Sequence, residues 1–178
     1  ETLTLPNRDT DTFVRRVASR TREGDSVAMP ADSMSHLLTA EELERVNIPG
    51  KSTELVRGRL LVREPPSTRH GSVAARLTYL LCDHVYRHYL GVVAQESGFK
   101  IESDPDTVRA PDVAFVGHAN ADRIPARGYA DFAPDLVVEV VSPNDRPGEL
   151  LSKVGQWLEA GTSLLWVIDP ARNEARVY

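Results

Sequence analysis

One short segment, residues 136–141, constrains the fold of this chain more than any other. It is almost entirely β-branched, which favours a strand, and its apolar residues do not alternate with polar ones. A strand with this pattern is covered on both faces, as in the centre of a sheet that has helices on each side. The chain is therefore expected to fold around this strand, and Glu139, its single acid, is expected to be buried.

Periodicity, capping and turn signals predict the elements on either side. In order they are a capped helix over 39–46, a hairpin of strands 53–56 and 59–63, a long helix over 67–89, strands 92–101, 109–116 and 136–141, a helix over 147–160, and strands 164–168 and 174–178. Residues 117–134 are predicted to form a loop. Residues 1–38 have no sustained period and are expected to form an irregular tail before one domain, 39–178. This order predicts an α/β fold (α+β, with a mixed sheet) and helices packed against the sheet.

The composition is that of a globular protein in a reducing compartment. Hydrophobic residues make up 41% and charged residues 26% of the 178 residues. Cys82 is the only cysteine, so no internal disulfide can form. The sequence has no apolar run of membrane-spanning length, and its polar N-terminal residues do not resemble a secretory signal. These features predict a cytoplasmic protein without a membrane partner.

Charge is unevenly spread along the sequence. The formal net charge is −5, but residues 51–90 contain seven basic and three acidic side chains, a net of +4, which leaves −9 for the rest. A basic stretch facing an acidic remainder can hold a phosphate backbone, and Arg69 and Arg76 are the predicted nucleic-acid contacts. The alternative is an ordinary solvated helix face.

Two acids interrupt apolar strands, Glu139 in the central one and Asp112 after Pro111 in the strand before it. A buried carboxylate is costly unless it is paired, protonated or bound to a cation. If the two strands are neighbours, the carboxylates converge and can hold Mg²⁺. The alternatives are a strand-edge position for Asp112 and a buried ion pair with an arginine for Glu139.

Lys153 is the predicted cationic partner of these acids. It falls on the flank of the buried face of the helix over 147–160, so its stem can lie on the core while its ammonium reaches the strand ends. An ammonium beside a metal-bound water can orient that water. The alternative is an exposed ion pair with Glu149, four residues earlier.

Several segments resemble, in order, the Uma-two (Uma2) family of restriction-type endonucleases, within the PD-(D/E)XK nuclease superfamily. They are Thr53-Glu54-Leu55-Val56-Arg57-Gly58, Pro65-Pro66-Ser67-Thr68-Arg69-His70, Arg109-Ala110-Pro111-Asp112, Pro134-Asp135-Leu136-Val137-Val138-Glu139-Val140-Val141-Ser142-Pro143, and Lys153 with Ala160-Gly161 and Trp166-Val167-Ile168-Asp169-Pro170. The resemblance covers roughly residues 36–178. It implies a restriction-endonuclease-like αβββαβ core with an N-terminal β-hairpin.

The resemblance also implies a set of site residues. Asp112 and Glu139 would be metal ligands, with the backbone carbonyl of Val140 as a further ligand. The lysine that the superfamily places two residues after the second acid is replaced here by Val141, and Lys153 would supply it from the next helix. Glu54 and His70 carry over as catalytic residues, Glu54 toward a water of the metal shell and His70 toward phosphate contact or proton transfer.

The function expected from these residues is a metal-dependent endonuclease that uses Mg²⁺, or Mn²⁺ in its place, to hydrolyse phosphodiester bonds. The expected substrate and partner is nucleic acid, DNA in particular, and a homodimer is left open. One alternative is a catalytically silent nuclease fold that binds nucleic acid or acts as a scaffold. A metal-free, glycosidase-like hydrolase is disfavoured because aromatic residues, which would line a sugar cleft, make up only 6% of the chain.

Overall fold

The computed structural model describes residues 37–143 and 145–178. In chain order its elements are α2 (Ala40–Leu43), β1 (Ser52–Val56), β2 (Arg59–Arg63), α3 (Thr68–Arg87), β3 (Gly91–Gln95), β4 (Phe99–Glu102), β5 (Thr107–Arg109), β6 (Val113–Gly117), α4 (His118–Ala121), β7 (Leu136–Val140), α5 (Pro147–Glu159), β8 (Leu164–Asp169) and β9 (Glu174–Val177). In these residues no helix is both long and apolar enough to cross a membrane.

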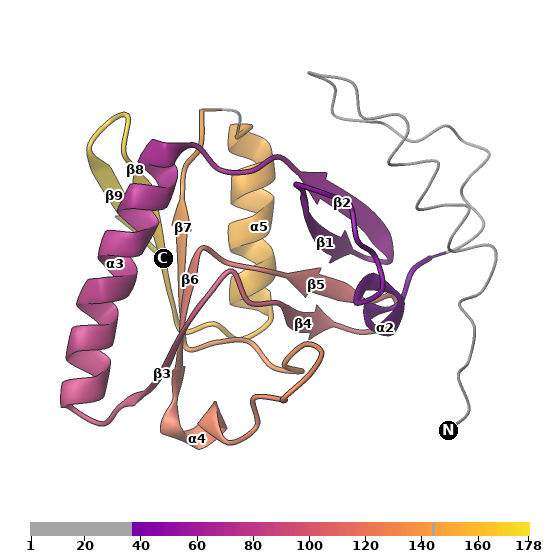
Figure 1. Cartoon of the computed structure of the whole chain (residues 1–178), viewed down its shortest axis with the longest axis horizontal. Helices are drawn as coiled ribbons and strands as arrows, with labels where there is room; N and C mark the ends of the chain where they lie inside the picture. The colour runs from indigo at the N-terminus through magenta and orange to yellow at the C-terminus, as the bar shows by residue number, and fades with distance from the viewer. Residues whose placement is uncertain (1–36, 144) are drawn as a thin grey trace.

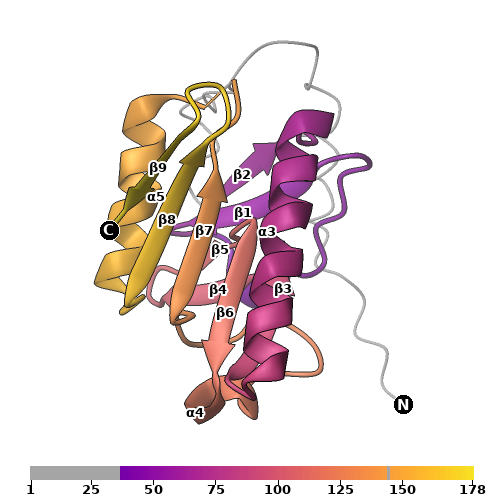
Figure 2. The same cartoon turned by 90° about the vertical axis from the view of Figure 1, so that its left-hand side faces the viewer.

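A five-stranded sheet, in the order β3-β6-β7-β8-β9, forms the centre of the fold. Its only parallel pair is β7 with β8, and every residue of β7 is buried, as the run without alternation predicts. Helix α3 packs on one face of this sheet and α5 on the other (Figures 1 and 2). On the α5 side, Trp157 and Leu165 are fully buried in the larger core cluster, which also includes Phe99.

The smaller sheet has four strands in the order β2-β1-β5-β4 and lies beside α5, on the side away from α3 (Figure 1). Its β1–β2 hairpin turns at Arg57 and Gly58, whose φ angles of 47° and 73° are both left-handed. Two consecutive left-handed residues form the tight turn that matches the twist of paired strands, and glycine adopts this conformation without steric cost. The hairpin and the capping box at Thr39 are confirmed.

Two of the predicted strands are wrong in the same way, because each is split between the sheets. The predicted strand over 92–101 is β3 in the large sheet and β4 in the small one, and the chain turns between them at Glu96, whose φ is 49°. The predicted strand over 109–116 is β5 and β6, separated at Ala110–Asp112, where Pro111 has no N–H to continue a ladder. The single mixed sheet expected from the sequence is therefore two sheets.

The order α3, β3, β6, β7, α5, β8 confirms the αβββαβ core, and β1–β2 is the N-terminal hairpin. The predicted loop over 117–134 contains one short helix, α4, that the sequence did not indicate. Most of the predicted tail, residues 1–36, lies outside the described residues. Leu38, the last residue of the predicted tail, is buried beside Leu43 and Leu55 in a second core cluster.

Candidate active site

Asp112 lies in the link between the two sheets, directly before β6. Its Oδ2 accepts a hydrogen bond from the backbone N–H of Val140 at 2.6 Å. This bond ties Asp112 to the end of β7, one residue beyond Glu139. The two acids that interrupt apolar strands therefore lie close enough for the charge of Asp112 to raise the pKa of Glu139.

Glu139 is buried, with 5% of its surface exposed, and points to the α5 side of the sheet. Its Oε1 accepts from the indole N–H of Trp157 at 3.0 Å, and its Oε2 accepts from Lys153 Nζ at 2.9 Å. Burial raises the pKa of Glu139 to about 7, although the Lys153 ammonium lowers it, and the nearby carboxylates add to the rise. The loss of water around this carboxylate therefore outweighs the stabilisation that the Lys153 ammonium gives to its charged form.

Lys153 reaches this carboxylate from α5, and its ammonium has three contacts. Besides Glu139, Nζ donates to the carbonyl of Ala110 at 3.2 Å and lies 3.4 Å from Oε1 of Glu54. Burial alone would lower the pKa of Lys153, but the two carboxylates outweigh it and hold the pKa above its ordinary value. Glu149, the alternative partner, lies instead 3.8 Å from both Arg63 and Arg146.

Glu54 brings the small sheet into the same cluster. It lies on β1, with 4% of its surface exposed, and its Oε1 accepts the backbone N–H of Ala110 at 3.0 Å. Its Oε2 accepts from Arg109 at 2.9 Å. Burial would raise the pKa of Glu54, but Lys153 and Arg109 lower it to about 2. Glu54 is therefore ionised at every pH at which the protein is expected to be folded.

His70 lies in the first turn of α3, where the Ser67 side chain caps the helix by accepting its N–H. The family resemblance implied phosphate contact or proton transfer for His70, and only 7% of its surface is exposed. Its Nε2 lies 3.2 Å from Oδ2 of Asp112. The hydrogen bond to Asp112 raises the pKa of His70 despite burial, and the Val140 backbone contributes in the same direction. The imidazole is therefore held against Asp112.

The oxygen atoms of Asp112, Glu139 and Val140 suit a hard cation that takes only a few of its ligands from the protein. The described part of the chain contains no cluster of three or more His, Cys, Asp or Glu side chains that could hold a metal. Asp112, Glu139 and the Val140 carbonyl would instead offer oxygen atoms alone. Mg²⁺ is commonly bound by one or two carboxylates, with water and substrate phosphate completing its shell. The donor set suits Mg²⁺ or Mn²⁺ and does not suit Zn²⁺, which prefers nitrogen and sulfur ligands.

Much of the basic stretch is neutralised within the fold. Four of its seven basic side chains pair with carboxylates, and they are Lys51, Arg57, Arg63 and Arg87. In the described residues Arg59, Arg69 and Arg76 have no acidic partner. Arg69 donates to the carbonyl of Pro170, and Arg76 is exposed on α3. The excess positive charge is thus concentrated on these three arginines.

Three contributors to the cluster were not predicted from the sequence: Arg109, Gln156 and Trp157. Arg109 is 5% exposed and connects two side chains. Its Nη1 donates to Glu54, and its Nη2 donates to Oε1 of Gln156 at 2.6 Å. An arginine in the short β-prone run 107–109 was a signal for a buried charge. Trp157 matched the pattern of a core residue, but a buried indole N–H needs an acceptor, and that requirement pointed to a nearby acid.

Comparisons with known proteins agree with this fold. The model of the Uma2 family, described as "Putative restriction endonuclease", matches residues 40–178. One similar solved structure is described as a putative nuclease belonging to DUF820 from Anabaena variabilis. It has a TM-score of 0.63 and 19% sequence identity over 79% of this chain and 84% of that chain. No curated protein matches the sequence. Because the family model covers most of the chain, the protein belongs to the Uma2 family of putative restriction endonucleases, and nuclease function in the general sense is supported.

Proposed function

We propose that this chain is a metal-dependent endonuclease that hydrolyses phosphodiester bonds in DNA. The observation that carries the proposal is the meeting of Asp112, Glu139 and Lys153 at the end of β7, where Asp112 bonds the residue next to Glu139 and Lys153 bonds Glu139 itself. Family membership supports the nuclease class. DNA is proposed from the family description and from the three arginines without acidic partners.

Asp112, Glu139 and the Val140 carbonyl would hold Mg²⁺ or Mn²⁺. When bound, such an ion supplies Lewis-acid activation of the phosphodiester and of the attacking water. The protein contributes the alignment of these oxygen atoms. The Val140 N–H and the His70 imidazole hold Asp112 in place, and the Trp157 indole fixes one oxygen of Glu139.

Lys153 has a defined task in this proposal. An ammonium has three hydrogen atoms, and here they face Glu139, Glu54 and the Ala110 carbonyl. The contact with Glu54, at 3.4 Å, is the longest of the three and the easiest to exchange. Through that hydrogen Lys153 would donate a hydrogen bond to the attacking water, and its charge would stabilise the negative charge that develops on the phosphate. Glu54 would then accept a hydrogen bond from the same water.

His70 is proposed as a positioning residue for Asp112. Its Nε2 contacts Oδ2 of Asp112, the oxygen that also accepts from the Val140 N–H, so the two contacts together fix the orientation of this ligand. His70→Ala would leave Asp112 free to rotate. We expect this variant to weaken metal binding, whereas His70→Asn, which keeps a donor, should recover part of it.

A second candidate is the catalytically silent nuclease fold. It is favoured by one observation: the three hydrogens of Lys153 and both oxygens of Glu139 already have partners within the protein. Such a cluster can stabilise the junction of two sheets without any metal. This candidate predicts that the protein binds nucleic acid but no divalent ion.

One experiment separates the two candidates. Calorimetric titration with Mn²⁺ is followed by cleavage of supercoiled, linear and single-stranded DNA in Mg²⁺ or Mn²⁺. The nuclease proposal expects one bound ion, cleavage by the wild type, and loss of both in Asp112→Asn. Glu149→Gln is the matched control because it removes an exposed acid at the start of α5. Absence of ion binding in the wild type would refute the proposal.

A homodimer remains part of the proposal. Tyr79, Leu80 and Tyr86 are all more than half exposed on α3, and they are the apolar surface that a second copy would cover. Light scattering of the wild type and of Leu80→Glu tests this, and a monomeric wild type would contradict it.

A further inference from the structure

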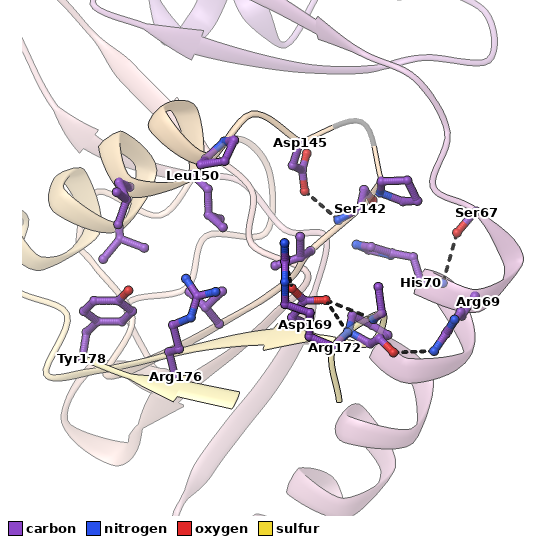
Figure 3. Close-up of a pocket in the computed structure, with 18 residues that line it drawn as sticks. Ser67, Arg69, His70, Ser142, Asp145, Leu150, Asp169, Arg172, Arg176 and Tyr178 are labelled. Carbon is purple, nitrogen blue, oxygen red and sulfur yellow. Dashed lines mark hydrogen bonds and ion pairs between the residues drawn. The ribbon is translucent and has the colours of Figure 1, made fainter. Parts of the chain in front are cut away.

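A cavity of about 350 Å³ lies next to the candidate active site, where the parallel strands β7 and β8 end. Figure 3 shows it between the first turn of α3, the start of α5 and the β8–β9 turn. His70 belongs to both places, because its ring lines the cavity while its Nε2 contacts Asp112. A molecule in this cavity would therefore lie beside the atoms that are proposed to cut the substrate.

One side of the cavity is basic, with Arg69, Arg172 and Arg176 in its lining. Arg69 contacts a carbonyl and no carboxylate of the described chain. Among the residues that the structure describes, the only acidic partner of Arg176 is Glu174, at 4.0 Å, and both side chains are about half exposed. These two guanidinium groups keep donors that can bind an anion.

The two acids in the lining already have hydrogen-bond partners. Asp169 accepts from the backbone N–H groups of Ala171 and Arg172 and from the Arg172 side chain, at 2.8 Å. Asp145 accepts the backbone N–H of Ser142 at 2.7 Å. In the described residues neither acid is paired with Arg69 or Arg176, so these two arginines line the cavity without being neutralised by its acids.

His70 supplies a second and independent indication of a ligand. Its ring is more than nine-tenths buried and, in Figure 3, points from α3 into the space between Ser142 and Arg172. Its Nδ1 has no hydrogen-bond partner. Because Nε2 is turned to the Asp112 carboxylate, Nδ1 is the ring atom left for a ligand: it accepts from a hydroxyl or amino group when the ring is neutral and donates to an oxygen when the ring is protonated.

The remaining wall is apolar. Leu150, Val154 and Val167 line it together with the ring of Tyr178, which is 39% exposed. A volume of about 350 Å³ lies at the lower end of the range for small-ligand sites. An aromatic and aliphatic wall facing arginines suits a ligand with a flat apolar ring at one end and an anion at the other, which is the chemistry of a nucleotide.

We propose that this cavity is a subsite for one unpaired nucleotide of the substrate strand, with its phosphate on Arg69 and Arg176 and its base against Leu150 and Tyr178. The proposal rests on the proposed nuclease function and deepens it. The nucleotide would adjoin the bond that is cut, and a sugar hydroxyl or a base amino group would reach Nδ1 of His70. The enzyme would then prefer single strands, overhangs or duplexes that open locally over a continuous paired duplex.

The test measures binding of deoxyadenosine monophosphate to the whole chain by calorimetry with chelator present, so that no metal contributes. Inorganic phosphate and deoxyadenosine are the comparison ligands. We expect the nucleotide to bind more tightly than either, and Arg69→Gln and Arg176→Gln each to weaken it by about tenfold or more. Arg87→Gln, on the same helix as Arg69 and paired with Asp83, is the matched control and should change nothing.

Further variants and ligands test the base contact apart from the phosphate contact, and single strands apart from duplexes. Tyr178→Leu should weaken the nucleotide and leave inorganic phosphate unchanged. Arg176→Gln should weaken a single-stranded oligonucleotide more than a blunt duplex. Equal affinity for inorganic phosphate and nucleotide would reduce the cavity to a plain anion site, and wild-type affinity in both arginine variants would remove the phosphate assignment. Equal losses on single strand and duplex would overturn the preference for an unpaired nucleotide.

Failure of the subsite and failure of the nuclease proposal give different results. Nucleotide binding without metal depends mainly on Arg69 and Arg176, and Asp112→Asn keeps a side-chain oxygen for Nε2 of His70, so binding should persist in this variant even if no DNA is ever cleaved. Conversely, a chain that cleaves DNA but binds no nucleotide in this cavity retains the nuclease function and loses the subsite. Circular dichroism of each variant confirms that the substituted chains are folded.

Discussion

Replacing Glu139 with glutamine should change how the stability of the metal-free protein depends on pH. Burial, aided by the charges of Asp112 and Glu54, gives this carboxyl a pKa of about 7 in the folded protein, against 4.5 ordinarily. The folded state therefore binds a proton that the unfolded state releases between these two values. Stability is then lost as the pH rises from about 4.5 to about 7, and glutamine, which does not ionise, removes this loss.

The size of the effect follows from the two pKa values. They differ by about 2.5, and each factor of ten in an ionisation constant is worth about 1.4 kcal/mol, so the full change is about 3 kcal/mol. In the variant an amide replaces the carboxylate beside the ammonium of Lys153, and this replacement has a cost in folding free energy of its own. That cost is present at every pH, so it cancels when the difference between variant and wild type is compared across the range.

The assay is urea unfolding at several pH values from about 4.5 to 8, with chelator present and tryptophan fluorescence as the signal. Trp157 is a suitable reporter because its indole donates to Glu139. The wild type should lose about 3 kcal/mol relative to Glu139→Gln over this range. Glu149→Gln, an exposed acid on the same helix, should stay parallel to the wild type. Parallel curves for Glu139→Gln would refute the argument that burial controls this carboxyl.

Three further predictions concern the neighbouring residues. Lys153→Met should reduce single-turnover cleavage roughly a hundredfold while Mn²⁺ still binds in calorimetry, and Glu149→Ala should leave the rate unchanged. Glu54, whose pKa is about 2 rather than 4.5, should contribute about 3 kcal/mol of stability above pH 4.5 that is lost as the pH falls toward 2. Glu54→Gln should remove most of it in denaturant titrations at neutral pH, and an unchanged midpoint would contradict the argument that Lys153 and Arg109 stabilise this carboxylate. DNA affinity should fall with rising salt, and Arg69→Gln and Arg76→Gln should each reduce the slope of that dependence by about one; wild-type slopes in both variants would leave them as ordinary surface residues.

The elements of this fold could be predicted where the signal is local. The hairpin at Arg57-Gly58, the Thr39 capping box and the Ser67 cap of α3 all depend on residues within a few positions of one another. The division into two sheets could not, because it depends on which strands pair over long distances. Residues 92–101 were predicted as one strand, but the left-handed turn at Glu96, followed by Ser97 and Gly98, sends their two halves into different sheets.

Some features of the candidate site could likewise be predicted from the sequence, and others could not. Asp112 and Glu139 could be identified because each places a charge in an apolar run, which is unusual whatever the pairing. Lys153 could also be identified, because it lies on the flank of the buried face of its helix. Its contact with Glu54 across the boundary of the two sheets could not be predicted, and neither could the contact of Arg109 with Gln156 over 47 positions. The burial of His70 was also hidden, since a histidine just inside a helix cap is exposed in many proteins. It is buried here because α3 brings it against Asp112.

Helix α5 carries Lys153, Gln156 and Trp157 on one face, and all three contact the buried acids or their arginine partner. Where these side chains point is set by the rotation of the helix and not by the length of the connection from β7. A change in the length of that connection would therefore leave the three side chains together, whereas one residue inserted within the helix would rotate the group by about 100°. A search that requires a lysine two residues after the strand acid would miss this chain, and one for the helical pattern Lys-x-x-Gln-Trp at variable distance would find it.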